Sequence, residues 1–376
     1  MRSRFVFFLV LAALSIVAVV DTVRGGLNKF DGIGPVILES ELENVGGGVS
    51  TDSKTPHVTV SGSLKMDAGG ITKFGIANDF GSVAITAGAG DSIEVDYDIT
   101  VYAESEEEAK KFADTCSVEL SASGGKARAQ LNRPPESSTN ITGVVTKYTV
   151  RLPARLKVDM VNRFGEASID GVSGDVDLEN QYGVTRASNL GGSLVARTGF
   201  GSAEVSRIAK DADITHGHGR LTLNGVQGDI ILRTRYSLVV VSDIAGEVDL
   251  TAEHGQVYVA DVDGGFTGRT SFSPVSGRNV HGTVLLTSEH GPVEISGIDG
   301  EARVQARYAP VRVELGEAAQ GYRVEMRARF GNIDADVPVT TGRPVQNEEQ
   351  ATVVVGRGGI PVHVESEFGR ITLRTR

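Results

Sequence analysis

Residues 164–313 repeat one pattern of apolar and polar positions with an 18-residue period. A flat ring recurs at that interval, at Phe164, Tyr182, Phe200, His218, Tyr236, His254, Phe272, His290 and Tyr308. Apolar residues follow each ring at fixed positions, as Val239 and Val241 follow Tyr236, and glycines recur next to the ring and ten positions after it. Such alternation is typical of strands with one buried face. Because two short strands cannot bury that face alone, the pattern predicts repeats stacked on one another.

The fold class that follows is all-β, a parallel β-solenoid (β-helix) built from 18-residue coils. In such a stack the aliphatic residues of successive coils share one dry interior, for example Val239, Val257 and Val293. The recurring glycines suit the corners of a coil, where a positive φ is needed. Each repeat consists of two similar halves of equal length, which favours a flattened coil with two sheets. A coil with three sheets stays open.

The repeats divide the chain into four parts. These are a signal peptide or N-terminal membrane anchor (1–26), a Gly-rich irregular segment (27–80), an N-terminal β cap region (81–160), and the solenoid repeats with closing C-terminal strands (161–376). Within the Gly-rich segment, weak strands are expected around 36–38 and 58–60.

The cap region is expected to contain strands and one short helix. The predicted strands lie near 83–86, 93–102, 117–121 and 144–151. Ser105 and Glu108 form a capping box for a helix that extends to about Ala113.

The repeat pattern returns near the C-terminus after a slip. A polar segment, 340–350, separates two matching stretches in which Val324, Met326 and Phe330 recur as Val362, Val364 and Phe368. Because the ends of a solenoid expose strand edges, we expect the segment 1–160 and the final strands to cover them.

The first residues predict export. Arg2 and Arg4 precede an apolar run, residues 5–20, which is shorter than the ~20 residues that cross a bilayer. A basic start before a short apolar core is typical of a signal peptide. Val19 and Val20 stand where a cleavage site prefers small residues, so a cleaved signal and an uncleaved inner-membrane anchor both stay open. The remaining chain would be periplasmic, on the outer surface or secreted, and would touch a membrane only through this segment.

Composition excludes several partners and sites. The net charge of −11 argues against nucleic acid as a partner. The single cysteine, Cys116, rules out an intramolecular disulfide and a multi-cysteine zinc site. Glycine is enriched, with 47 residues where average usage gives roughly 26, as a fold with many corners requires.

The amino-acid sequence of residues 148–183 resembles that of a known family. The segment YTVRLPARLKVDMVNRFGEASIDGVSGDVDLENQYG combines a strand, a Leu152-Pro153 step and runs of Gly-x-apolar-x-apolar, and the final GIPVHVESEFGRITL has the same character. Both resemble the bacterial putative-adhesin family, a domain of unknown function with a β-solenoid fold, and the resemblance covers most of residues 80–376. It implies no catalytic residues.

The recurring histidines could indicate a metal site, but their spacing argues against one. His218, His254 and His290 share one register on alternate coils, so neighbours lie ~9–10 Å apart, while zinc–nitrogen bonds measure ~2.0–2.1 Å. His216 and His218 form an H-x-H with no evident third ligand, and the half-repeats lack the Gly-x-Asp of calcium-binding nonapeptides. We expect a corner that accepts flat rings, with no metal, cofactor or catalytic residue.

Acidic residues are plentiful at solvent-facing positions: Asp175, Asp177, Asp211, Asp213, Asp229, Glu247 and Asp249. A glycosidase needs two carboxyls ~5–9.5 Å apart in a cleft, and a regular column predicts a solvated face instead. In register, Asp177, Asp213 and Asp249 alternate with Arg197, Arg233 and Arg269. This predicts a zigzag of ion pairs on one outer face, each contributing ~0.2–1 kcal/mol.

Together these patterns predict an exported, non-catalytic β-solenoid, a putative adhesin or envelope scaffold that binds through flat repetitive faces. Its partner would be a polysaccharide, a surface or an envelope protein. Two alternatives stay open: a carbohydrate-active β-helix enzyme of the lyase or glycosidase type, and a periplasmic, membrane-anchored structural or signalling partner. The sequence indicates neither the ligand nor the oligomeric state.

Overall fold

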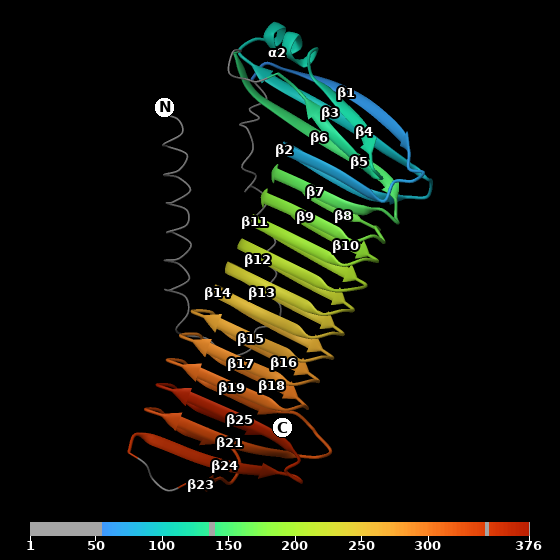
Figure 1. Cartoon of the computed structure of the whole chain (residues 1–376). Coiled ribbons are helices and arrows are strands. Elements are labelled where there is room, and N and C mark those ends of the chain that lie inside the picture. The colour runs from blue at the N-terminus through green and yellow to red at the C-terminus, as the bar shows by residue number, and fades with distance from the viewer. Residues whose placement is uncertain (1–54, 135–139, 343–345, 376) are drawn as a thin grey trace. The chain divides into compact units, whose positions relative to one another are not determined.

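The computed structural model describes residues 55–134, 140–342 and 346–375. Within them the protein is all-β with one helix, α2 (Glu106–Ala113). The predicted all-β class is confirmed, and most neighbouring strands pair in parallel (Figure 1).

The repeat region is a regular series of strands. They are β7 (Lys157–Phe164), β8 (Ala167–Asp170), β9 (Val176–Tyr182), β10 (Thr185–Leu190), β11 (Leu194–Ile208), β12 (Ala212–Val226), β13 (Ile230–Ile244), β14 (Val248–Val262), β15 (Phe266–Ser271), β16 (Val275–Val280), β17 (Val284–Glu289), β18 (Val293–Ile298), β19 (Ala302–Arg307) and β20 (Val311–Leu315). Successive repeats pair in parallel one period apart, so that Leu221 lies opposite Val239 and Val239 opposite Val257. After β14 the pairing continues as two runs, one through β15, β17 and β19 and one through β16, β18 and β20.

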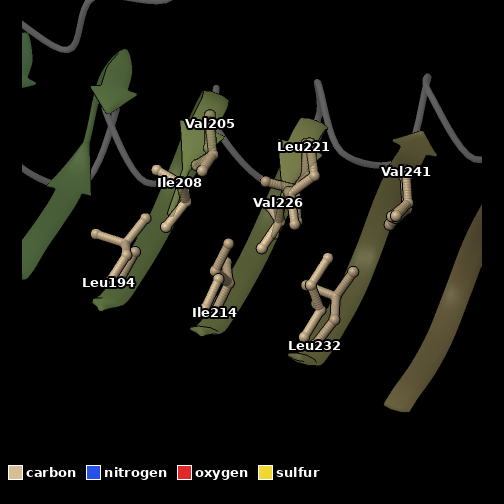
Figure 2. Packing of buried hydrophobic residues seen from close by; sticks show 14 of the residues in the cluster. Leu194, Val205, Ile208, Ile214, Leu221, Val226, Leu232 and Val241 are labelled. Atoms are coloured by element: carbon tan, nitrogen blue, oxygen red, sulfur yellow. The ribbon is translucent and has the colours of Figure 1, made fainter. Parts of the chain in front are cut away.

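The inward side chains of the repeats form one apolar core. Val239, Val257 and Val293 are 0%, 1% and 2% exposed, which confirms that they face the interior. Figure 2 shows the same arrangement for neighbouring repeats, where Ile208 lies beside Val226 and Ile214 beside Leu232. The inward side chains of successive repeats lie at equivalent positions, so each repeat packs its apolar side chains against those of the repeat before it.

A column of mostly polar side chains lies inside this core, two positions before the rings, and Ala252, Ala306 and Ala328 interrupt it. Asn78 Nδ2 donates a hydrogen bond to Asn162 Oδ1 (3.0 Å), and Asn162 Nδ2 donates to Asn180 Oδ1 (3.3 Å). Further along, Thr198 Oγ1 and His216 Nδ1 lie 2.7 Å apart. The amides of Asn162 and Asn180 also donate to backbone carbonyl groups at the ring corner. Since a buried polar group without a partner is costly, this column favours one alignment of the turns.

The N-terminal part of the described chain contains β1 (His57–Asp67), β2 (Lys73–Gly88), β3 (Ser92–Ala103), β4 (Ser117–Ser123), β5 (Lys126–Asn132) and β6 (Ile141–Pro153). The predicted helix is confirmed: the Ser105 hydroxyl accepts a hydrogen bond from Glu108 N (3.3 Å) and donates to Glu108 Oε2 (3.1 Å). The predicted strands are present too, whereas β5 was not anticipated.

β1 contains the weak strand predicted around 58–60, whereas the expectation that 27–80 is otherwise irregular is wrong for the full length of β1 and for β2. β1 pairs antiparallel with β3 along its whole length and alternates partly buried with exposed side chains. Its glycine, Gly62, lies beside the Tyr97 ring, where a Cβ would come within 2.4 Å of Cζ. This glycine therefore serves packing rather than disorder. The signal or anchor segment and the weak strand around 36–38 lie outside the described residues.

β2 is itself the first repeat. Phe80, Gly81, Val83 and Ile85 follow the repeat order, and β2 pairs in parallel with β7 and β8. The repeat pattern thus begins before residue 161, and β3–β6 with α2 are inserted between the first and second repeats.

The C-terminal strands are β21 (Tyr322–Arg329), β22 (Ile333–Ala335), β23 (Thr340–Thr341), β24 (Glu348–Val355), β25 (Ile360–Glu367) and β26 (Ile371–Thr375). The predicted recurrence is confirmed, because β25 pairs in parallel with β21 and places Val362 opposite Val324. β25 also pairs in parallel with β19, so the last repeat in sequence lies between the two that precede it. The polar segment 340–350 contains β23 and the start of β24, which runs antiparallel along β21.

Two of the predicted ion pairs are present on the outer face. Arg197 Nη1 lies 2.7 Å from Asp177 Oδ1, and Arg233 Nη1 lies 3.0 Å from Asp213 Oδ1. In the part of the chain that the structure describes, Asp249 forms no ion pair with an arginine, so a continuous zigzag is wrong. Each of these arginines takes one carboxylate, from the preceding repeat. Both pairs are about half exposed and contribute little.

Candidate functional site: a column of stacked rings

Among the residues that the structure describes, twelve flat rings stack face to face along one corner of the repeats. This ring column comprises, in spatial order, Phe80, Phe164, Tyr182, Phe200, His218, Tyr236, His254, Phe272, His290, Tyr308, Phe368 and Phe330. Neighbouring centroids lie 4.4–5.1 Å apart, with interplanar angles of 3–9°. The predicted ring corner is confirmed, and it extends by one repeat at the N-terminal end and two at the C-terminal end.

The ring column combines covered faces with exposed edges. Phe200, Tyr236, Phe272 and Phe330 are 41%, 51%, 52% and 52% exposed, although inner rings have a neighbour on both faces. The exposed surface is therefore a narrow stripe of ring edges, most of them phenylalanine and tyrosine with three histidines among them. Soluble proteins rarely leave such a continuous stripe uncovered unless it contacts something.

The backbone at the ring corner takes two forms. In the first five repeats the residue after the ring is a glycine with positive φ, from 119° to 134° at Gly81, Gly165, Gly183, Gly201 and Gly219. A Cβ on Gly165 would lie 2.0 Å from the carbonyl oxygen of Gly81, so glycine is required there. From Tyr236 onward the ring residue itself has positive φ, for example 53° at Phe272. That conformation costs a non-glycine residue roughly 1–2 kcal/mol, which ring stacking at ~0.5–1.5 kcal/mol per pair offsets.

The histidines of the ring column do not gather into a metal site. No cluster of three or more potential metal-ligating side chains occurs among the described residues. His216 and His218 lie in different columns: His218 stacks between Phe200 and Tyr236, whereas His216 is buried and bonded to Thr198. Burial lowers the pKa of His216 to about 4, with a smaller effect from His218. Its Nε2 has no hydrogen-bond partner among the described residues, so the ring is held neutral inside the core.

Charges beside the ring column are paired with one another. Arg235 Nε lies 3.3 Å from Glu253 Oε2, and Arg307 Nε lies 3.2 Å from Glu367 Oε2. The Arg307 guanidinium also lies 5.0 Å from the centroid of the Tyr308 ring. The column is thus flanked by compensated charge, which leaves its apolar edges as the distinctive surface.

Several carboxylates of the acidic columns bind the backbone of the next repeat. Asp211 Oδ1 accepts from Asp229 N (3.0 Å), and Asp229 Oδ1 accepts from Glu247 N (2.9 Å). Asp175 Oδ1 accepts from Ser193 N (3.3 Å) in the same way. These carboxylates satisfy strand-end N–H groups, and they line a regular edge rather than a cleft.

A hollow of about 410 Å³ on the outer face of β1, β3 and β6 brings two carboxylates together. Asp98 accepts from Ser61 (2.6 Å) and Asp96 from Ser63 (2.7 Å). The Ser63 hydroxyl, followed by Arg151, holds the pKa of Asp96 below its usual range. A general acid for glycoside hydrolysis needs a raised pKa instead, so Asp96 does not have the character of that acid.

No protein-family model matches this chain, and none of the curated proteins matches it. Among solved structures, a putative cell adhesion protein from Clostridium sporogenes is 11% identical, with a TM-score of 0.20, over 85% of this chain and all of that one. A putative adhesin from Parabacteroides distasonis is 9% identical, with a TM-score of 0.27, over 84% of this chain and 97% of that one. A putative lipid binding protein from the same organism is 8% identical, with a TM-score of 0.27, over 83% and 96%. Likeness at this level leaves the function to be argued from the chain's own residues.

Across the described residues, no helix has the length and apolar character needed to span a bilayer. The apolar run at 5–20, on which the export prediction depends, lies outside them.

Proposed function

We propose that this chain is an exported, non-catalytic parallel β-solenoid that binds an extended partner through the ring column. The observation that carries the proposal is the column itself, an unbroken row of twelve rings whose edges stay open to solvent. The exposed ring edges are costly without a partner, because they leave apolar surface in water.

The geometry favours a protein or envelope surface over a sugar chain as the partner of the ring column. A sugar packs on the face of an aromatic ring, and the faces of the inner rings are occupied by their neighbours. Ring edges spaced close to the ~4.8 Å strand separation can instead contact a continuous apolar surface. Because the charges on either side of the ring column are paired with one another, they give this contact little preference for a partner of either charge.

Two sequence features support export and adhesion. Arg2 and Arg4 followed by the apolar residues 5–20 have the form of an export signal. Residues 148–183 resemble the bacterial putative-adhesin family, which is consistent with a binding role and assigns no catalytic residue.

The test is adhesion of the purified protein to immobilised envelope fractions and to a glycan array. Tyr236→Asn, Phe272→Asn and Tyr308→Asn together remove three rings at positive-φ positions that asparagine tolerates. We expect this variant to lose envelope binding while keeping its circular dichroism spectrum. Tyr258→Ser, which removes an exposed tyrosine outside the column, is the matched control and should bind normally.

Three results would contradict the proposal. Unchanged adhesion of the triple variant would remove the ring column from binding. Binding only to glycans, with no envelope component, would favour the polysaccharide alternative. Release of sugar ends from a polysaccharide, abolished by one carboxylate substitution, would show an enzyme. Fractionation with N-terminal sequencing of the mature chain separates a released adhesin from a membrane-anchored periplasmic partner.

A further inference from the structure

The edge of β2 changes partner part-way along its length. β5 pairs with β2 over Lys73–Ile76, and β6 pairs with it from Gly81 to Gly88. Between them, at residues 77–80, no described strand pairs with this side of β2. A pocket of about 180 Å³ opens at this break, and it is lined by Ala77, Asn78, Asp79, Phe80, Arg128, Gln130, Leu131, Arg133, Val144 and Thr146.

A buried amide lies at the inner end of the pocket. Asn78 is 6% exposed and is the first member of the interior polar column. Its Nδ2 donates to Thr146 O (3.3 Å) and to Asn162 Oδ1 (3.0 Å). Every later amide oxygen of this column accepts from the residue before it, whereas no described donor reaches the Asn78 oxygen. The pocket therefore offers a hydrogen-bond acceptor that a ligand hydroxyl can use.

The mouth of the pocket carries positive charge in an otherwise acidic chain. Arg128 and Gln130 are exposed on β5, and neither side chain forms a hydrogen bond or ion pair with another described residue. The one acidic residue of the lining, Asp79, is compensated by Arg163 (3.0 Å) and Arg133 (3.9 Å). This leaves the Arg128 guanidinium available to an anion, and its planar fork matches a carboxylate.

The remaining wall is apolar. Phe80 is the first ring of the ring column and stacks on Phe164 at 4.9 Å, while Leu131 and Val144 stand across the pocket. At about 180 Å³ the pocket is smaller than the ~300–1,000 Å³ of most small-molecule sites. It therefore suits a single ring rather than a nucleotide or a folded segment.

We propose that this pocket binds one carboxylate-bearing sugar ring, such as a uronic acid. Its carboxylate would pair with Arg128, its hydroxyls would bond Gln130 and the Asn78 oxygen, and its C–H face would pack on the apolar wall. This site shares only Phe80 with the ring column, so it stands whether or not the column binds a partner.

The test is isothermal titration calorimetry of the purified full chain with D-glucuronate, D-glucose, acetate and a galacturonate tetramer. We expect glucuronate to bind at least about tenfold more tightly than glucose, which lacks the charge pair with Arg128, and than acetate, which lacks the hydroxyls and the ring face. Arg128→Gln should weaken glucuronate binding by about tenfold or more. Arg220→Gln, an exposed arginine on the repeats without a partner among the described residues, is the control and should leave binding unchanged. Tighter binding of the tetramer would identify a polysaccharide as the source, and equal binding would identify a free sugar acid; both support the site.

A second variant separates loss of the site from loss of folding. Gln130→Glu places a negative charge at the mouth of the pocket on an exposed position of β5 and should weaken glucuronate but not glucose. No glucuronate binding into the millimolar range would overturn the proposal, as would equal affinity for acetate. An Arg128→Gln variant that binds as the wild type does would overturn it too.

Discussion

Phe266 is a large ring whose two neighbours in its core column are aliphatic. In register, Val248 precedes it and Val284 follows it. Its space is provided by two glycines at core positions: a Cβ on Gly268 would lie 3.3 Å from Phe266 Cζ and 2.5 Å from Leu286 Cδ2, and a Cβ on Gly277 would lie 2.8 Å from Ile295 Cδ1. Neither glycine has a positive φ, so conformation does not demand them. The local core therefore combines one large side chain, Phe266, with two glycines, Gly268 and Gly277, that leave room for it.

This matching predicts that Gly268→Ala changes its effect when Phe266 is made smaller. With Phe266 in place, the added methyl overpacks the core at a cost of about 1–3 kcal/mol, partly offset by the roughly 0.5–1 kcal/mol that alanine gains over glycine in a strand. Phe266→Leu alone should cost about 2 kcal/mol, below the roughly 3–5 kcal/mol of a Phe→Ala change. In the Phe266→Leu background the Leu286 methyl can move into the vacated space, so Gly268→Ala should become neutral or stabilising.

The assay is a double-mutant cycle from urea unfolding followed by circular dichroism, with constant m-values required for comparison. We expect a coupling free energy of about 1–2 kcal/mol, within the range seen for residues in contact. Gly75→Ala is the control, because its Cβ would meet nothing closer than Ala127 O at 4.0 Å. Additivity of Phe266→Leu and Gly268→Ala within about 0.5 kcal/mol would refute the matched-core argument.

Three further predictions concern the ring corner, the buried histidine and the surface ion pairs. Phe272→Asn should destabilise the protein by about 1 kcal/mol less than Phe164→Asn. Both substitutions lose ring stacking, but only at position 272 does asparagine relieve a positive φ. Equal losses of unfolding free energy in urea would argue against backbone strain at 272. His216 has a folded-state pKa lowered to about 4, so the unfolded chain binds a proton below its ordinary 6.5 and the folded chain does not. The free energy of unfolding should therefore fall by about 3 kcal/mol as pH drops from 6.5 to 4. The His216→Thr variant, which copies the neighbouring Thr198 and Thr234, should lack this pH-dependent loss. If the free energies of unfolding of the two proteins changed in parallel with pH, a neutral buried His216 would be contradicted. Asp213 and Arg233 should show a coupling free energy of only about 0.2–1 kcal/mol, decreasing with salt in a double-mutant cycle, since both side chains are about half exposed.

The regular part of this fold could be predicted from the sequence because each position of the repeat has one environment. The constant period from Phe164 to Tyr308 fixes which side chains share a column, and the burial of Val239 and Val257 follows from it. The ring column could be predicted for the same reason. The period breaks between Phe80 and Phe164, whose separation is not a whole number of repeats. A search at the repeat spacing therefore misses the first ring, although Gly81, Val83 and Ile85 follow it in repeat order.

Other features depend on contacts between distant segments. The two C-terminal stretches that end in Phe330 and Phe368 carry the same motif, so the sequence alone does not indicate which of them contacts Tyr308. The structure places Phe368 there, at 5.0 Å. The pocket at residues 77–80 could not be predicted from the sequence either. It forms between the stretches of β2 that pair with β5 and with β6, and both strands belong to an insertion that does not follow the repeat. The change in corner conformation at Tyr236 also follows no residue pattern that we can identify, since Gly255 and Gly291 still follow their rings without a positive φ.

The two departures from the repeat have one physical consequence in common. A parallel stack leaves a row of unpaired N–H and C=O groups at each end, and such edges recruit further strands. At the first repeat, β5 and β6 pair in parallel with β2, and β3 and β1 then add antiparallel beyond β6. At the other end, β24 runs antiparallel along β21, with β23 beside it. Because β1, β3, β23 and β24 run antiparallel to their neighbours, they do not continue the 18-residue repeat. Within the described residues the ring column therefore ends at Phe80 and at Phe330, so the partner proposed for it would meet a stretch of defined length.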